Sequence, residues 1–217
     1  MELELKRECL DTYELGEPQT LTQEETAETI VPDYCPDIAR IISAEGVVCL
    51  HGGTEQDGVT GTVRVTVLYT PENESGVRAL EFAMPFSAQG EGLAGCAHVV
   101  VETEIELLES RMLNPRKIFT RCKLVTHLAG CRKVCLTISS DAETDPALLV
   151  EKRCCGQTVS LLRQGAEKDL TFSETMSLSL GREGAAELLH CRANGIVTET
   201  KAIGNKLIFK GVFLVSA

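Results

Sequence analysis

Apolar and polar residues alternate along much of the chain, which is the pattern of β-strands with one buried face. The clearest example spans residues 59–69, where four valines and Tyr69 share one face while threonines and Arg64 share the other. This pattern is typical of a half-buried antiparallel strand. We therefore expect strands to dominate the fold.

Two further alternating segments carry opposite charges on their polar faces. Residues 99–107 place three glutamates on one side, namely Glu102, Glu104 and Glu106. Residues 118–128 place three basic side chains on one side, namely Arg121, Lys123 and His127. On neighbouring strands these charges would lie opposite each other, each pair contributing about 0.2–1 kcal/mol.

Other strands are predicted between clusters of turn-forming residues. They span residues 46–51, 79–84, 133–139, 156–163, 170–180, 195–201 and 206–215. This rhythm predicts an all-β fold, mainly antiparallel sheets arranged as a sandwich or a barrel. One short helix is expected near residues 36–43, because Pro36 and Asp37 suit a first helical turn and Gly46 would follow its end.

The chain is expected to divide into a first domain, residues 1–140, a linker, residues 141–150, and a partial repeat, residues 151–217. Aligning residues 21–48 with 170–197 at a constant offset of 149 gives seven identities in 28 positions. One inserted residue then pairs Gly61 with Gly211 and Val63 with Phe213. The alternative is that two amphipathic hairpins share turn glycines by accident.

Four short motifs lie in the first copy. They contribute the residues Pro32, Asp33, Pro36, Asp37, Ile38, Gly61, Tyr69, Pro85, Phe86, Asn114 and Arg116. In this order they resemble the SPOCS domain, the repeated domain of SipL-like spore coat morphogenesis proteins in endospore-forming bacteria. The resemblance covers roughly residues 25–125, and the partial second copy resembles the start of another such domain.

The resemblance implies a binding role. The family has no catalytic set to carry over, and its members act as adaptors in the mother-cell cytoplasm that help attach the coat to the forespore. The implied partner is a spore coat morphogenetic protein, a coat-organising ATPase. Members with that role typically end in a LysM module, and no segment after residue 195 resembles one.

Charge and composition narrow the possible partners. Lys and Arg number 21 against 32 Asp and Glu, and the resulting net charge of -11 repels nucleic acid and anionic membrane surfaces. The charged N-terminal segment does not resemble a signal peptide, and no run of 18 apolar residues predicts membrane insertion. We therefore expect a cytoplasmic protein.

The ten cysteines include no Cys-x-x-Cys pair, so we interpret them as mostly reduced thiols. A zinc site formed by Cys122, His127, Cys131 and Cys135 is an alternative, although residues five apart on a strand face opposite sides. A second alternative is a thiol switch at Cys154 and Cys155, beside basic residues that favour the thiolate. No cofactor is expected.

Catalytic chemistry has little support in the sequence. The three glutamates of residues 99–107 suit a solvated strand face, and no phosphate-binding loop or nucleophile elbow is present. The apolar strand at residues 206–215 is a candidate partner-binding edge, carried by Leu207, Phe209, Phe213 and Val215. We expect a non-catalytic protein-binding or scaffold protein that binds a coat partner or self-associates. The alternative is a small-ligand-binding protein or an enzyme with a site between the two repeats.

Overall fold

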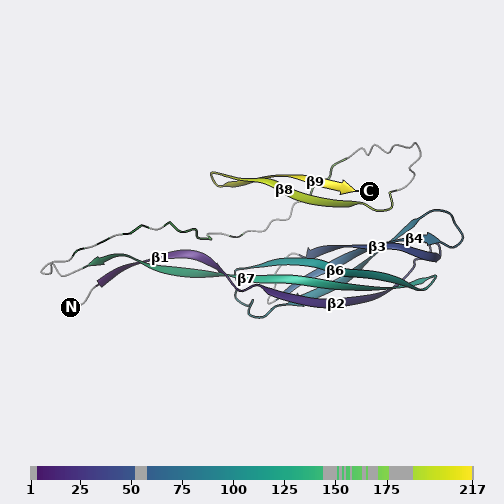
Figure 1. The fold of residues 1–217 in the computed structure, drawn as a ribbon, viewed down its shortest axis with the longest axis horizontal. Coiled ribbons are helices and arrows are strands. Elements are labelled where there is room, and N and C mark those ends of the chain that lie inside the picture. The colour runs from purple at the N-terminus through teal and green to yellow at the C-terminus, as the bar shows by residue number, and fades with distance from the viewer. Residues whose placement is uncertain are drawn as a thin grey trace.

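The regular structure of the chain is all strand, in antiparallel sheets (Figure 1). The computed structural model describes residues 4–51, 58–143, 151, 153, 155–156, 158–162, 165, 171–175 and 188–216. The strands within these residues are β1 (Glu4–Leu15), β2 (Gln19–Ile30), β3 (Ile38–His51), β4 (Gly58–Pro71), β5 (Arg78–Gln89), β6 (His98–Asn114), β7 (Lys117–Glu143), β8 (Arg192–Ile203) and β9 (Lys206–Ser216). The all-β prediction is confirmed.

Two of the sheets form a sandwich that contains the core (Figure 1). In one sheet β7 pairs with β2 and β6, and in the other β4 lies between β3 and β5. The alternation of β4 determines its burial, because Val63, Val65 and Val67 are at most 1% exposed while Arg64 is exposed. Ile118, Cys122 and Leu124 of β7 are buried in the same cluster.

A two-stranded arm extends from the sandwich (Figure 1). The first part of β7 pairs with β2 through residues 117–128, and its later residues, 131–143, pair with β1. Side chains of the arm are mostly exposed, including Leu5, Leu15 and Leu136. A ribbon of two strands buries little apolar surface by itself.

The third sheet is the hairpin of β8 and β9, which lies apart from the sandwich in Figure 1. Its turn contains Gly204, whose φ of 60° lies in the left-handed region that favours glycine. The predicted strands at residues 195–201 and 206–215 are confirmed in this hairpin. Nearly all its side chains are exposed on both faces.

The helix predicted near residues 36–43 is wrong, because β3 begins at Ile38. The Ile38 backbone amide donates to the Pro115 carbonyl oxygen (2.9 Å), and the Asp37 carboxylate binds Arg116 instead of capping a first turn. β-Branched residues along this segment favour the extended conformation. Gly46, expected after the helix, lies within β3 instead.

Two other predicted strands fall on partly described segments. Among the described residues, 158–162 and 171–175 have no regular structure, and the remainder of 156–163 and 170–180 lies outside them. Residues 141–143 of the expected linker end β7, and residues 144–150 are not described. No helix long and apolar enough to span a membrane occurs in the described part of the chain.

Candidate functional site

The Arg116 side chain joins two motifs that lie far apart in the sequence. Its Nη1 donates to the Cys35 carbonyl oxygen (2.7 Å) and to Asp37 Oδ1 (3.0 Å). Its Nη2 donates to the Val31 carbonyl oxygen (3.0 Å) and to Asp33 Oδ1 (3.1 Å). We call this group the Arg116 clasp. It holds the connection between β2 and β3 against the β6–β7 turn.

Backbone groups of the same turn complete the attachment. The Asn114 Oδ1 atom accepts a hydrogen bond from the Arg116 amide (2.9 Å), which stabilises the turn in the manner typical of asparagine. The Val31 amide donates to the Arg116 carbonyl oxygen (2.9 Å). The β6–β7 turn therefore binds the connection through both its backbone and the Arg116 side chain.

Tyr69 supports the connection from the sandwich core. Its hydroxyl donates to the Pro36 carbonyl oxygen (3.3 Å), and burial, followed by the nearby Cys35, raises the pKa of this phenol. Tyr34, in contrast, is 87% exposed. The connection is thus held through backbone carbonyl groups and the Asp33 and Asp37 carboxylates while it presents an exposed aromatic ring.

The two remaining motifs meet across β4 and β5. Gly61 lies opposite Phe86, and a Cβ atom at position 61 would come within 2.4 Å of the Phe86 ring. Glycine at position 61 therefore leaves room for the Phe86 ring. Pro85 is exposed on β5, an edge strand of its sheet, where proline discourages pairing with another strand.

The outer face of β7 carries charge pairs with β6. Arg121 Nη2 lies 3.0 Å from Glu109 Oε2, and Lys123 Nζ lies 2.9 Å from Glu106 Oε2. Glu102 faces His127 in the β6–β7 register. Lys123 with Glu106 and His127 opposite Glu102 match the predicted facing of opposite charges. Glu104, in contrast, faces Val125, and the partner of Arg121 is Glu109, which is not one of the three predicted glutamates.

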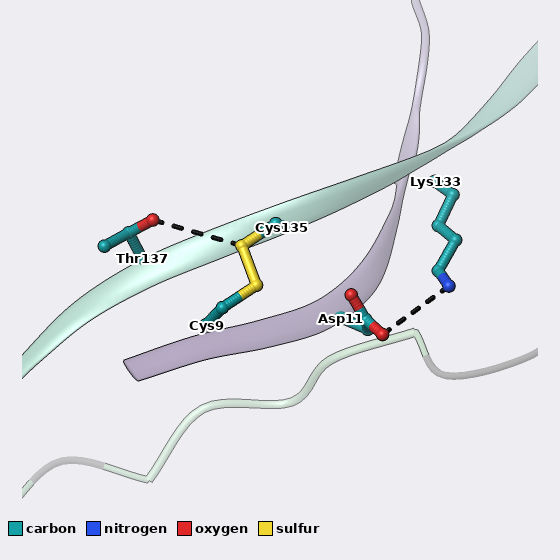
Figure 2. Close-up of a disulfide and its surroundings, with 5 residues drawn as sticks. All are labelled: Cys9, Asp11, Lys133, Cys135 and Thr137. Carbon is teal, nitrogen blue, oxygen red and sulfur yellow. Dashed lines mark hydrogen bonds and ion pairs between the residues drawn. A yellow bond between two sulfur atoms is a disulfide. The ribbon is translucent and has the colours of Figure 1, made fainter. Parts of the chain in front are cut away.

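A disulfide joins β1 to the later part of β7 in the two-stranded arm, between Cys9 and Cys135 (Figure 2). Their Cα atoms lie 5.6 Å apart, and the ion pair of Asp11 with Lys133 (3.5 Å) lies beside them. The sequence did not predict this bond, because the two residues are separated by 126 positions and become neighbours only through the β1–β7 register. The bond connects both strands of the arm covalently.

The four residues of the alternative zinc site do not converge. Cys122 is fully buried, and burial, aided by Glu25, raises the pKa of its thiol to about 11. His127 is exposed and forms a hydrogen bond with Thr20 (3.0 Å). Cys135 is bonded to Cys9. Of the proposed thiol switch, Cys155 is an exposed free thiol and Cys154 lies outside the described residues.

A cavity of about 1010 Å³ lies between the sandwich and residues 190–194, which include the start of β8. It is lined by β3 residues 44–49, by parts of β4, β5 and β6, and by residues 190–194. His190 Nε2 lies 3.2 Å from Glu45 Oε2, although the two atoms are not in hydrogen-bonding geometry. The cavity therefore lies between β3 and the start of β8, two segments that align in sequence.

The predicted partner-binding edge is largely exposed. Leu207, Phe209 and Phe213 are 59–66% exposed, and Val215 is half-buried. The Phe172 ring lies 5.1 Å from the Phe213 ring, measured between centroids. Among the described residues β9 pairs with β8 alone, so its other edge carries no strand.

The fold and these sites define an all-β sandwich that carries a largely exposed hairpin. Comparison with models of known protein families, with curated proteins and with solved structures finds no match to this chain.

Proposed function

We propose that this chain is a non-catalytic protein-binding or scaffold protein of the SPOCS type that acts in spore coat or spore envelope assembly. Its partner is a spore coat morphogenetic protein or another copy of the chain, in the mother-cell cytoplasm. The observation that carries the binding role is the β8–β9 hairpin, whose apolar side chains are exposed beside a strand edge that no other described strand pairs with. Such an edge can accept a further strand through main-chain hydrogen bonds.

The Arg116 clasp supports the resemblance on which the coat role rests. Motif residues that are some 80 positions apart meet through one guanidinium group, including Asp33, Asp37 and Arg116 itself. These residues have a structural role within the domain, because each contact fixes a loop or a turn. A binding module needs a rigid framework of this kind to present its exposed segments.

A pull-down from sporulating cells tests the proposal. The full chain and its Phe209→Asp variant serve as baits, and Leu15→Asp is the matched control because Leu15 is 55% and Phe209 61% exposed. We expect wild type and L15D to capture the same coat protein and F209D to lose it. Equal capture by all three baits would contradict the proposal, and so would a wild type that captures neither a coat protein nor another copy of the chain.

A small-ligand site between the repeats is the second candidate. The cavity beside β3 favours it, because the cavity is large enough for a metabolite and holds the Glu45–His190 pair. It ranks second because, among the described residues, no third histidine, cysteine or acidic side chain converges with this pair into a group that could hold a metal ion.

A further inference from the structure

We propose that β9 pairs antiparallel with β9 of a second copy of the chain, forming a two-fold dimer around Gly211. This inference rests on the proposed binding function and names the occupant of the unpaired edge. The dimer joins two hairpins into one four-stranded sheet in the order β8, β9, β9, β8. Two-fold dimers of this kind use the same surface on both subunits.

The first repeat shows what covers the corresponding edge. The sequence alignment pairs β8–β9 with β3–β4, and in the sandwich the second strand of that pair, β4, binds β5 antiparallel along its other edge. The pairing within the two hairpins differs by two residues, because Gly46 faces Val65 whereas Gly195 faces Phe213, the counterpart of Val63. The edge of β9 is therefore expected to bind an antiparallel strand.

The sequence of β9 is complementary to itself. Gly211 is the midpoint of Lys206–Ser216, so pairing about it uses the whole strand. The facing pairs are Leu207 with Val215, Ile208 with Leu214, Phe209 with Phe213, Lys210 with Val212, Lys206 with Ser216, and Gly211 with itself. Phenylalanine thus faces phenylalanine and aliphatic residues face aliphatic residues, and the two-fold axis repeats each of these pairs. No lysine faces a lysine.

Charge placement disfavours one of the two neighbouring registers. A register centred on Lys210 would place the two copies of that lysine directly opposite each other, which is unfavourable. In the proposed register Lys210 faces Val212 and keeps its ion pair with Glu199 (3.1 Å). The edge also differs from that of β5, because β9 contains no proline.

The test uses two residues that face each other within one hairpin. Val212 on β9 is 49% exposed and Ile196 on β8 is 47% exposed, and the two are direct cross-strand partners. The Val212→Lys substitution places a lysine opposite Lys210 of the second copy at two symmetric positions. The matched control, Ile196→Lys, adds the same charge on the strand that lies away from the dimer axis.

Sedimentation of the full chain across a concentration series supplies the measurement. We expect wild type and I196K to form dimers of similar affinity and V212K to weaken the dimer about tenfold or more. Val212→Glu should preserve the dimer, because a glutamate there faces a lysine. A monomeric wild type, or equal effects of V212K, V212E and I196K, would overturn the proposal.

The outcome also separates this inference from the coat role. A monomeric wild type that still captures a coat protein through Phe209 overturns self-pairing and leaves the coat role standing. A dimer that V212K dissociates, without capture of a coat protein, supports self-pairing and overturns the coat role.

Discussion

The hairpins β3–β4 and β8–β9 align in sequence but differ in burial. Val63 of β4 is 0% exposed, whereas its counterpart Phe213 of β9 is 59% exposed. In the hairpin β3–β4, the Ile105 and Leu108 side chains of β6 approach Gly46 from the opposing sheet. In the hairpin β8–β9, the neighbour of Gly195 is Phe213, which belongs to that hairpin itself. Alternation therefore determines which residues share a face, and a second layer determines whether that face is buried.

The edge strands of the sandwich also differ from the edge of the β8–β9 hairpin in how readily they could pair with a further strand. In the sandwich, β5 carries Pro85 at its edge and β6 carries a row of glutamates, both of which discourage further strand pairing. The β9 edge has phenylalanines and aliphatic residues with two lysines, Lys206 and Lys210. The β5 and β6 edges thus discourage strand addition, whereas the β9 edge carries no such feature beyond its two lysines.

The largest expected difference in unfolding free energy between the two hairpins comes from placing a carboxylate at aligned positions. Val63→Asp buries an unpaired charge in the core and should cost more than about 4 kcal/mol, enough to prevent folding of the sandwich. Phe213→Asp should change the unfolding free energy of the sandwich by less than about 0.5 kcal/mol. Circular dichroism during urea unfolding measures both, and equal losses would show that the second hairpin is as buried as the first.

The next effect distinguishes the Arg116 clasp from the charge pairs on the outer face of β7. Arg116→Ala leaves the carbonyl groups of Val31 and Cys35 without their partner and should lower the unfolding free energy by about 2–3 kcal/mol. Arg121→Ala removes an exposed pair with Glu109 and should cost at most about 1 kcal/mol.

Urea unfolding of both arginine variants supplies the comparison, with Arg116→Lys as a third sample. Lysine cannot reach four acceptors with a planar fork, so R116K should recover only part of the loss. If R116A were no less stable than R121A, the clasp would contribute no more than a surface pair.

The sequence predicted the parts of the fold that have one apolar face. Residues 59–69 alternate valine with polar residues, and the structure buries that face. The facing of Glu106 and Lys123 was predicted for the same reason, because both segments show their polar face clearly. Such patterns are local, so no knowledge of the register is needed to find them.

The parts that were missed depend on distant contacts. The half-buried face of β2 includes Gln23 and Glu25 as well as Leu21, so it shows little apolar alternation. The Cys9–Cys135 bond requires the β1–β7 register. The motif residues were named from the resemblance, but their meeting on Arg116 depends on two sheets being packed together.

The smallest expected effect concerns the pH dependence of the sandwich relative to the hairpin. Burial raises the pKa of Cys122 from 9.0 to about 11, so the folded chain favours the neutral thiol. The contribution of this thiol to the unfolding free energy is fully present below pH 9. It is lost as the pH rises through about 11, because the thiol of the unfolded chain releases its proton at a lower pH than the thiol of the folded chain. Between pH 8 and pH 10 the wild type should therefore lose about 1 kcal/mol from this group.

Unfolding free energies of wild type, Cys122→Ala and Cys191→Ala across this pH range isolate that contribution. Cys191 is an exposed thiol just before β8, so C191A should follow the wild-type profile. C122A should lose less stability with rising pH than wild type does. Tyr69, whose pKa is also raised, is present in all three proteins, so its effect cancels in the comparison. Parallel profiles for wild type and C122A would show that the Cys122 thiol titrates in the folded sandwich as it does in the unfolded chain.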